Sequence, residues 1–356
     1  LYIRNSKIHL KPGLFTDQGD LDTLASHTGG KDGVGGSVNR PLVPAEDVMT
    51  GQCEPWPQCA TYHVPGCTND NWGGCTRIGN SRTGGDIINP VTSARLNTMG
   101  KFSFQYGRVE FRAKLSRGDW LWPALWLLPE KSGPEGGEGD PYGEWPASGE
   151  IDIMESRGND HTYRDIWGDP AGRNAACSTL HYGKTEHLPD GSKALADGWR
   201  NAHYNMVVDP EYDFTQAFHT FGLYWAEDAL YTYVIFPNGT ESKMLDLSGG
   251  FKNGFFKSPL GGNTGKPGEE GWDKVTDNPY EGHPLSAPFN QKFYLIMNVA
   301  IGGDWWWDYA PWKACGRSEE CTYINKFWDV RDQWYPTWLE AGEDSALQVD
   351  WVRVWQ

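Results

Sequence analysis

The amino-acid sequence predicts an all-β fold, a jelly-roll sandwich of two antiparallel sheets. Alternation of hydrophobic and polar residues is its dominant periodic signal, and no window of about 15 residues combines a helical period with caps. Glycine (44 residues) and proline (23 residues) are abundant among the 356 residues, as expected where turns join many strands. The 19 tryptophans, 16 tyrosines and 14 phenylalanines exclude a disordered chain, because they provide ample hydrophobic surface to bury.

The clearest strand covers residues 106–115 and predicts a sheet with one buried face. Hydrophobic side chains alternate along it with charged ones: Val109, Phe111, Ala113 and Leu115 against Arg108, Glu110, Arg112 and Lys114. The other strands are expected at residues 1–3, 8–10, 122–128, 149–155, 177–182, 203–208, 217–225, 229–236, 292–300 and 347–355. Many antiparallel strands with few helices favour two packed sheets.

Segments rich in Gly, Pro, Asn and Asp separate these strands, notably residues 130–144, 183–198 and 257–289. Loops of this length commonly carry binding or catalytic residues. No linker and no internal repeat divides the sequence, so we expect one domain over residues 1–356.

The charge balance limits the classes of partner. The chain has 47 acidic and 31 basic residues, a net charge of −16. Nucleic-acid binding relies on clustered Lys and Arg that release counterions from phosphates, so no nucleic-acid partner is expected. The longest hydrophobic stretches, such as residues 121–129, fall short of the roughly 20 residues that cross a bilayer. We expect a soluble monomer that has no membrane partner.

Seven cysteines predict disulfides and a secreted protein. Six of them occur in two groups rich in loop residues: Cys53, Cys59, Cys67 and Cys75, then Cys315 and Cys321. Their spacing lacks the C-x2-C pairs of a zinc ribbon, so a metal site is the weaker interpretation. Disulfides need an oxidising compartment, and we expect that a signal peptide has been removed. Four crowded cysteines allow three pairings, and Cys177 is expected to be a buried free thiol.

Residues 144–155, with the sequence EWPASGEIDIME, place three acids in a segment otherwise suited to a core strand. The strand period of two puts Glu150 and Asp152 on one face and the isoleucines on the other. Glu155 is out of register by one residue. A β-bulge near residues 153–154 would return it to the face of the other acids.

Three carboxylates on one face suit glycoside hydrolysis. With one residue bulged out, the backbones of Glu150 and Glu155 lie about 13 Å apart at about 3.3 Å per residue. Their side chains can then lean together toward the separation of about 5–5.5 Å found in retaining glycosidases. Asp152 raises the proton affinity of its neighbours, because like charges disfavour joint ionisation. One glutamic acid would stay protonated as general acid while the other attacks as a carboxylate.

Three acids alone are equally compatible with a solvated acidic face on an edge strand. A metal site is a weaker alternative, because no histidine accompanies the acids closely in the sequence. The surrounding tryptophans favour a sugar site: Trp145 precedes the acids, residues 119–126 add three indoles, and Trp305–Trp307 follow a glycine turn. Flat indoles with a polar N–H match the alternating C–H and O–H groups of a pyranose ring.

On these residues the chain resembles glycoside hydrolase family 16, whose laminarinase branch carries W-P-A-x-G-E-I-D-I-M-E. Nearly the whole chain takes part, and eukaryotic members resemble it at residues 89–129, 178–183 (STLHYG), 218–225 (FHTFGLYW), 293–305 (FYLIMNVAIGGDW), 331–338 and 349–355. The most similar branch comprises invertebrate endo-1,3-β-glucanases and the related β-1,3-glucan recognition proteins. The family implies a jelly roll whose concave sheet forms an open carbohydrate-binding cleft, and hydrolysis with retention of configuration.

The resemblance gives roles to individual residues. Glu150 resembles the nucleophile, Glu155 the acid/base and Asp152 the assisting carboxylate, while Trp145 matches the indole beside the cleaved bond. The further candidates for sugar contact are Trp122, Trp126, Arg95, His181, Asn298 and Trp305, the last in a WWW run that is not a general family feature. Ordinary structural roles stay open for the arginine, the histidine and the asparagine.

The resemblance also implies that Asp350 can join a structural calcium site on the convex face, although no cofactor is required. We therefore expect a secreted endo-1,3-β-glucanase that cuts laminarin-type β-1,3-glucans with retention. The alternative is a non-hydrolytic β-1,3-glucan recognition protein of innate immunity, but such relatives typically lack one or both catalytic glutamates. A mixed-linkage glucan or a sulfated galactan is a third possibility, and the net charge argues against the sulfated one.

Overall fold

The computed structural model describes residues 1–18, 20–21, 43–64, 75–130, 141–165, 167–187, 193–248, 279–303 and 323–356. They form two compact units. The first comprises Leu1–Lys11, Ala94–Ala300 and Glu340–Gln356, and the second comprises Pro12–Ser93 and Ile301–Leu339. The expectation of one domain over residues 1–356 stays a prediction.

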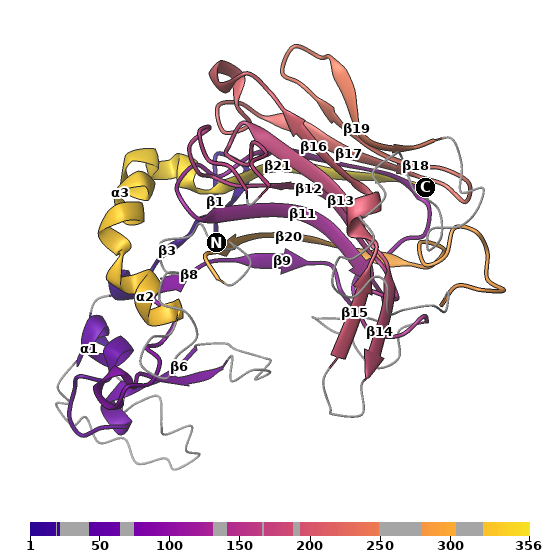
Figure 1. Cartoon of the computed structure of the whole chain (residues 1–356). Helices are drawn as coiled ribbons and strands as arrows, with labels where there is room; N and C mark the ends of the chain where they lie inside the picture. The colour runs from indigo at the N-terminus through magenta and orange to yellow at the C-terminus, as the bar shows by residue number, and fades with distance from the viewer. Residues whose placement is uncertain are drawn as a thin grey trace. The chain divides into compact units, whose positions relative to one another are not determined.

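Two antiparallel sheets build the first unit and confirm the all-β sandwich (Figure 1). One sheet has the strand order β1 (Tyr2–Arg4), β2 (Lys7–Leu10), β21 (Leu347–Trp355), β10 (Gly107–Lys114), β17 (His219–Trp225), β18 (Leu230–Ile235) and β19 (Glu241–Leu247). The other has the order β16 (His203–Val207), β13 (Ala175–His181), β12 (Glu150–Ser156), β11 (Leu121–Pro129), β20 (Phe293–Ile301) and β9 (Arg95–Asn97). The strands expected from alternation all form, close to their predicted bounds.

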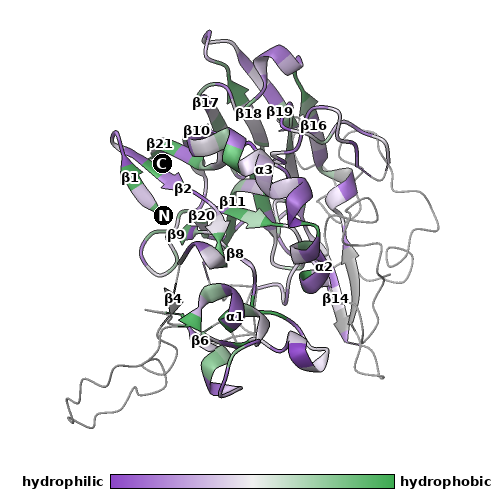
Figure 2. Ribbon diagram, turned by 90° about the vertical axis from the view of Figure 1, so that its left-hand side faces the viewer, coloured by the Kyte–Doolittle hydropathy of each residue, from purple (hydrophilic) through white to green (hydrophobic). Residues whose placement is uncertain are grey.

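Hydrophobic side chains fill the space between the two sheets. Trp225 of β17 meets Phe293 of β20 edge to face, with ring centroids 5.5 Å apart. The buried hydroxyl of Thr232 on β18 donates to Ser178 Oγ on β13 at 2.8 Å, so these two core hydroxyls are paired across the sheets. Figure 2 shows hydrophobic residues along β11, where every residue is buried except the partly exposed Trp122 and Trp126. Each large buried side chain stabilises the sandwich by about 1.5–3 kcal/mol.

A separate two-stranded sheet in the first unit corrects one prediction. Residues 183–198, expected as a loop, contain β14 (Gly183–His187) and β15 (Lys193–Asp197), which pair antiparallel. Their sequences GKTEH and KALAD lack the alternation of a half-buried strand, which hid them. The Thr185 hydroxyl donates to the Trp145 carbonyl at 2.6 Å and ties the hairpin to the segment before β12.

The second unit contains short elements. Its strand pairs are β3 (Gly13–Leu14) with β8 (Val91–Thr92), β4 (Asp20–Leu21) with β5 (Val43–Pro44), and β6 (Thr61–His63) with β7 (Thr76–Ile78). Its helices are α1 (Ala45–Thr50), α2 (Tyr323–Asp329) and α3 (Arg331–Ala341), and residues 340–341 at the end of α3 are assigned to the first unit. Helix α3 escaped prediction because Pro336 lies inside it, although Trp334 packs against Phe327 at 4.5 Å between ring centroids. None of the helices that the structure describes is long and apolar enough to cross a membrane.

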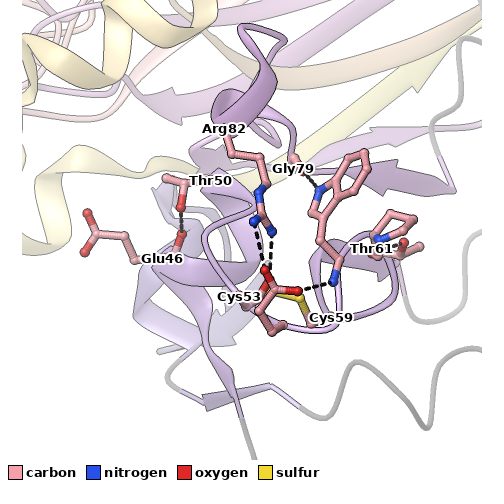
Figure 3. The surroundings of a disulfide bond; sticks show 10 residues. Glu46, Thr50, Cys53, Cys59, Thr61, Gly79 and Arg82 are labelled. Atoms are coloured by element: carbon pink, nitrogen blue, oxygen red, sulfur yellow. Dashed lines mark hydrogen bonds and ion pairs between the residues drawn. A yellow bond between two sulfur atoms is a disulfide. The ribbon is translucent and has the colours of Figure 1, made fainter.

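The cysteine-rich segment contains a disulfide between Cys53 and Cys59 (Figure 3). Beside it, the Arg82 guanidinium donates to the Cys53 carbonyl at 3.3 Å and to the Glu54 carboxylate at 2.8 Å. Cys75 is also disulfide-bonded. Of the remaining cysteines, Cys177 is free as predicted, though only partly buried, and Cys67, Cys315 and Cys321 lie outside the described residues.

Gly222 of β17 lies directly opposite Tyr233 of β18, where a larger side chain would destabilise the fold. A methyl group at Gly222 would meet the Tyr233 ring at 2.0 Å. That ring cannot shift freely, because the Tyr233 hydroxyl donates to Glu110 at 2.8 Å and accepts from Arg108 at 2.7 Å. Gly222→Ala should therefore lower the free energy of unfolding by about 1–3 kcal/mol, measured by chemical denaturation. Gly13→Ala is the control, since its nearest neighbouring atom lies at 3.5 Å, and equal stability of the two variants would contradict this account.

Candidate functional site

Strand β12 carries the three acids that the sequence singles out, and a β-bulge places them on one face. In the pairing with β11, Glu155 lies opposite Ala124 and Asp152 lies opposite Trp126, which leaves one residue of β12 without a partner. The pairing with β13 shifts in the same interval. The bulge predicted near residues 153–154 is confirmed, and it brings the third acid back to the side of the other two.

We call the sheet face that bears the three acids the carboxylate face. The opposite face belongs to the core, where Leu125 and Leu127 of β11 and Ile151 of β12 are 0% exposed. On the carboxylate face, Trp122 and Trp126 of β11 are partly exposed. The alternation along β11 thus separates core leucines from indoles that neighbour the acids.

Each glutamate of β12 accepts a hydrogen bond from an indole. Trp145 Nε1 donates to Glu150 Oε2 at 2.7 Å, and Trp122 Nε1 donates to Glu155 Oε1 at 2.9 Å. The Arg157 guanidinium lies over the Trp122 ring, 5.1 Å from its centroid. Indole N–H groups are donors only, so they orient the carboxylates without competing for a proton.

The chain enters β12 through a turn that requires glycine. Gly149, the residue before Glu150, has a φ of +88°. A Cβ there would also lie 3.1 Å from atoms of both Pro288 and Phe289. Glycine alone accepts this φ without strain, so it fixes the direction in which the first acid leaves the turn.

His181, at the end of β13, joins the acids. It lies opposite Glu150 in the pairing of β12 with β13. Its Nε2 is 3.2 Å from Asp152 Oδ2, and its Nδ1 is 2.6 Å from Asp197 Oδ2 at the end of β15. The Trp145 ring lies beside the imidazole, with 5.3 Å between the centroids. No histidine accompanies the acids closely in the sequence, but the resemblance names His181 as a candidate, and the structure places it against Asp152.

Burial sets the proton affinities of this cluster. It raises the pKa of Glu150 well above the ordinary value, with a further contribution from Asp152. It raises the pKa of Asp152 to about 6, aided by Glu155, and it raises the pKa of Glu155. Burial lowers the pKa of His181, but Asp197 and Asp152 outweigh it and hold that pKa well above the ordinary value. The cluster therefore combines an imidazolium with carboxyl groups that retain protons more readily than in water.

The same residues provide a geometric metal candidate. One ligand atom from each of Glu150, Asp152 and His181 lies within 4.8 Å of the others. A metal ion there would need a neutral imidazole and would replace the contact between His181 Nε2 and Asp152, while Asp197 could still accept from Nδ1.

A second group of predicted residues gathers on the neighbouring strands β11, β20 and β9. Trp126 Nε1 donates to Asn298 Oδ1 at 2.6 Å. The Arg95 guanidinium lies over the Trp126 ring, 4.8 Å from its centroid, and Arg95 pairs with Asn298 across the strands. Asn298 thus accepts a hydrogen bond from the indole, and the exposed Arg95 cation lies over the same ring.

Two predicted residues lie apart from these groups. Asp350 of β21 forms an ion pair with Arg112 of β10 in the seven-stranded sheet. A calcium ion there would have to displace that guanidinium, so this pairing does not support the predicted metal site, which stays a prediction. Trp305 lies outside the described residues.

Sequence reasoning missed Asp197. Asp197 lies within residues 183–198, which were predicted to be a loop, and it is separated from His181 by 16 positions in the sequence. A prediction of the β14–β15 hairpin would have found it. In a hairpin the last residue of the second strand lies opposite the first residue of the first strand, which here places Asp197 opposite Gly183 and near His181.

The family model described as "Glycosyl hydrolases family 16" matches residues 80–235. A β-1,3-glucan-binding protein of Penaeus monodon is 39% identical over 302 residues, which cover 82% of this chain and 69% of that relative. A β-1,3-glucan-binding protein of Tenebrio molitor is 30% identical over 268 residues (75% of this chain, 46% of the relative). A glucan endo-1,3-β-glucosidase of Cryptopygus antarcticus is 32% identical over 223 residues (62% of this chain, 60% of the relative).

The chain thus spans less than two thirds of the Tenebrio and Cryptopygus proteins and slightly more of the Penaeus protein. The residues matched by the family model include β11, β12 and β13, which carry the acids and the histidine that faces them. With this segment and the extended similarity to the Penaeus protein, the chain belongs to glycosyl hydrolase family 16.

Proposed function

We propose that the chain is an endo-acting β-1,3-glucanase that hydrolyses laminarin-type glucans with retention of configuration. In this proposal Glu150 is the nucleophile, Glu155 is the acid/base and Asp152 assists. One observation carries it: the bulge in β12 places both glutamates on one face, where each accepts a hydrogen bond from its own indole.

In the first step, the Glu150 carboxylate attacks the anomeric carbon of the bound glucan. The bond from that carbon to the departing oxygen breaks, and Glu155 transfers its proton to this oxygen. In the second step, Glu155 takes a proton from water, and the water oxygen attacks the same carbon. The ester bond to Glu150 breaks, which restores its carboxylate and leaves Glu155 protonated for the next cycle.

The environment of the two glutamates suits these roles. Burial raises the pKa of Glu155, which helps it to hold the proton that it must donate. The Trp122 N–H then stabilises the carboxylate left behind. Burial and the neighbouring Asp152 raise the pKa of Glu150 well above its ordinary value, so in this proposal the proton that the two acids share must lie on Asp152 when Glu150 attacks.

A neutral glucan fits the remaining features. The net charge of −16 disfavours binding of a polyanion. The partly exposed indoles of Trp122, Trp126 and Trp145 lie beside the acids, where they can stack on a neutral sugar ring. We also propose that the protein is secreted, supported by the Cys53–Cys59 disulfide. No cofactor is needed, because carboxyl groups and water complete both steps.

The second candidate function is binding of β-1,3-glucan without hydrolysis. The names of the Penaeus and Tenebrio relatives favour it. Incubation with laminarin followed by analysis of the soluble products distinguishes the two: shorter oligosaccharides support the glucanase, and binding without them supports the recognition protein.

Glu150→Gln should lower the release of reducing ends from laminarin by at least about a thousandfold, because the amide cannot attack the anomeric carbon. Laminarin binding, measured by calorimetry, should persist. Glu340→Gln provides the control, since this exposed acid forms an ion pair with Arg117 and should leave the rate unchanged. Release of reducing ends by the Glu150 variant at nearly the wild-type rate would disprove the assignment of the nucleophile.

Asp152→Asn should move the acid limb of the pH–rate profile to lower pH. In the wild type, kcat/KM should fall as the pH drops through the raised pKa of Glu150, because a protonated Glu150 cannot attack the anomeric carbon. Burial is the larger cause of the raised pKa of Glu150, and the charge of Asp152 is the next. Removing that charge should lower the limb by about one pH unit and the rate by about a hundredfold. A limb that stays in place or moves upward would rule out this coupling.

A further inference from the structure

The charged contacts on the carboxylate face extend to a fourth carboxylate, which the proposed reaction does not use. His181 lies between two aspartates, with Nε2 3.2 Å from Asp152 Oδ2 and Nδ1 2.6 Å from Asp197 Oδ2. Both aspartates are well shielded, with side chains 2% and 13% exposed. Because the imidazole has a carboxylate at each nitrogen, its orientation and its protonation are set from both sides.

Asp197 is itself held in place by the fold. It is the last residue of β15 and lies opposite Gly183, the first residue of β14. Its Oδ1 accepts the backbone N–H of Trp199 at 3.1 Å and that of Tyr182 at 3.4 Å. With Oδ1 occupied by backbone donors, Oδ2 is left to face His181. The base of the hairpin thus fixes the carboxylate, and the carboxylate fixes the ring.

We propose that Asp197 is a positioning residue, which orients His181 and keeps it cationic against Asp152 so that Glu150 can react as a carboxylate. This inference rests on the proposed hydrolysis. It assigns no contact between Asp197 and the substrate, because Asp197 acts through the imidazole. An Asp that holds a histidine in the required tautomer and stabilises its cation is a known way to support catalysis.

The charges around His181 determine the direction of the effect. Titratable groups face it from three strands: Glu150, Asp152 and Glu155 on β12, Asp197 on β15 and His203 on β16. The cation on His181 in turn lowers the pKa of Glu150 and of Asp152, against the stronger effect of burial. Without the Asp197 charge, His181 would lose its proton more easily. The pKa of Glu150 would then rise, opposite to the change expected for Asp152→Asn.

The test is Asp197→Asn, which keeps the shape of the side chain and removes the charge. The amide oxygen can still accept from the backbone N–H groups, and the amide nitrogen then faces Nδ1 of His181. The acid limb of the kcat/KM profile for laminarin should move upward by about one pH unit, and kcat near the optimum should fall by about tenfold or more, with KM changed less. In parallel, ¹⁵N NMR of the His181 ring should show a doubly protonated imidazole at neutral pH in the wild type and its titration at lower pH in the variant.

Asp246→Asn is the matched control, because it also removes one negative charge but from an exposed pair with Lys243 in the other sheet. It should change neither the profile nor the His181 signals. If Asp197→Asn folds and keeps the wild-type profile and the wild-type His181 titration, the proposal is wrong. The NMR titration needs no substrate: a chain that does not cleave laminarin would refute the proposed function, and a shifted titration would still establish the Asp197–His181 coupling.

Discussion

The bulge in β12 is the constraint on which the rest of the site depends. Side chains alternate along a strand, so an unbulged β12 would direct Glu155 toward the core side, where Leu125 and Leu127 are 0% exposed. A carboxylate there would lack partners and would destabilise the sandwich. The extra residue returns Glu155 to the carboxylate face and lets the hydrophobic residues of β12 continue to fill the core. Packing and chemistry therefore require the same irregularity.

The crowding of acids that follows from the bulge has an electrostatic consequence. Glu150, Asp152 and Glu155 lie on one short strand, and Asp197 adds a fourth carboxylate, while His181 is the cation in direct contact with two of them. Full ionisation would leave an excess of buried negative charge, so the cluster retains protons instead. A retaining glycosidase needs such a retained proton on one carboxyl group and a free carboxylate on the other. Burial disfavours full ionisation of the acids, and the same burial retains the proton that the proposed reaction needs.

Local sequence patterns predicted the sheets and the shared face of the acids, because both follow from the two-residue repeat of a β-strand. The strand at 347–355 and the bulge near residues 153–154 follow from alternation and from its interruption. The parts that escaped depend on contacts distant in sequence. The β14–β15 hairpin has no hydrophobic alternation, α3 contains Pro336, and Asp197 acquires a role only because the hairpin returns it to His181. Likewise, no pattern foretold that Arg112 would pair with Asp350.

Tryptophan serves two physical purposes in this chain, which explains its abundance better than either alone. Trp225 and Trp334 are buried and supply core area, with their N–H groups bonded to backbone carbonyls. On the carboxylate face, Trp122 and Trp145 donate to carboxylates instead. A lysine or arginine in those places would hold both glutamates ionised and remove the acid that the proposed reaction needs. An indole donor lowers the pKa of each glutamate less than burial raises it, so it orients the carboxyl group without forcing it to ionise. Because the indole carries no charge, one glutamate can remain an acid beside another that reacts as a nucleophile.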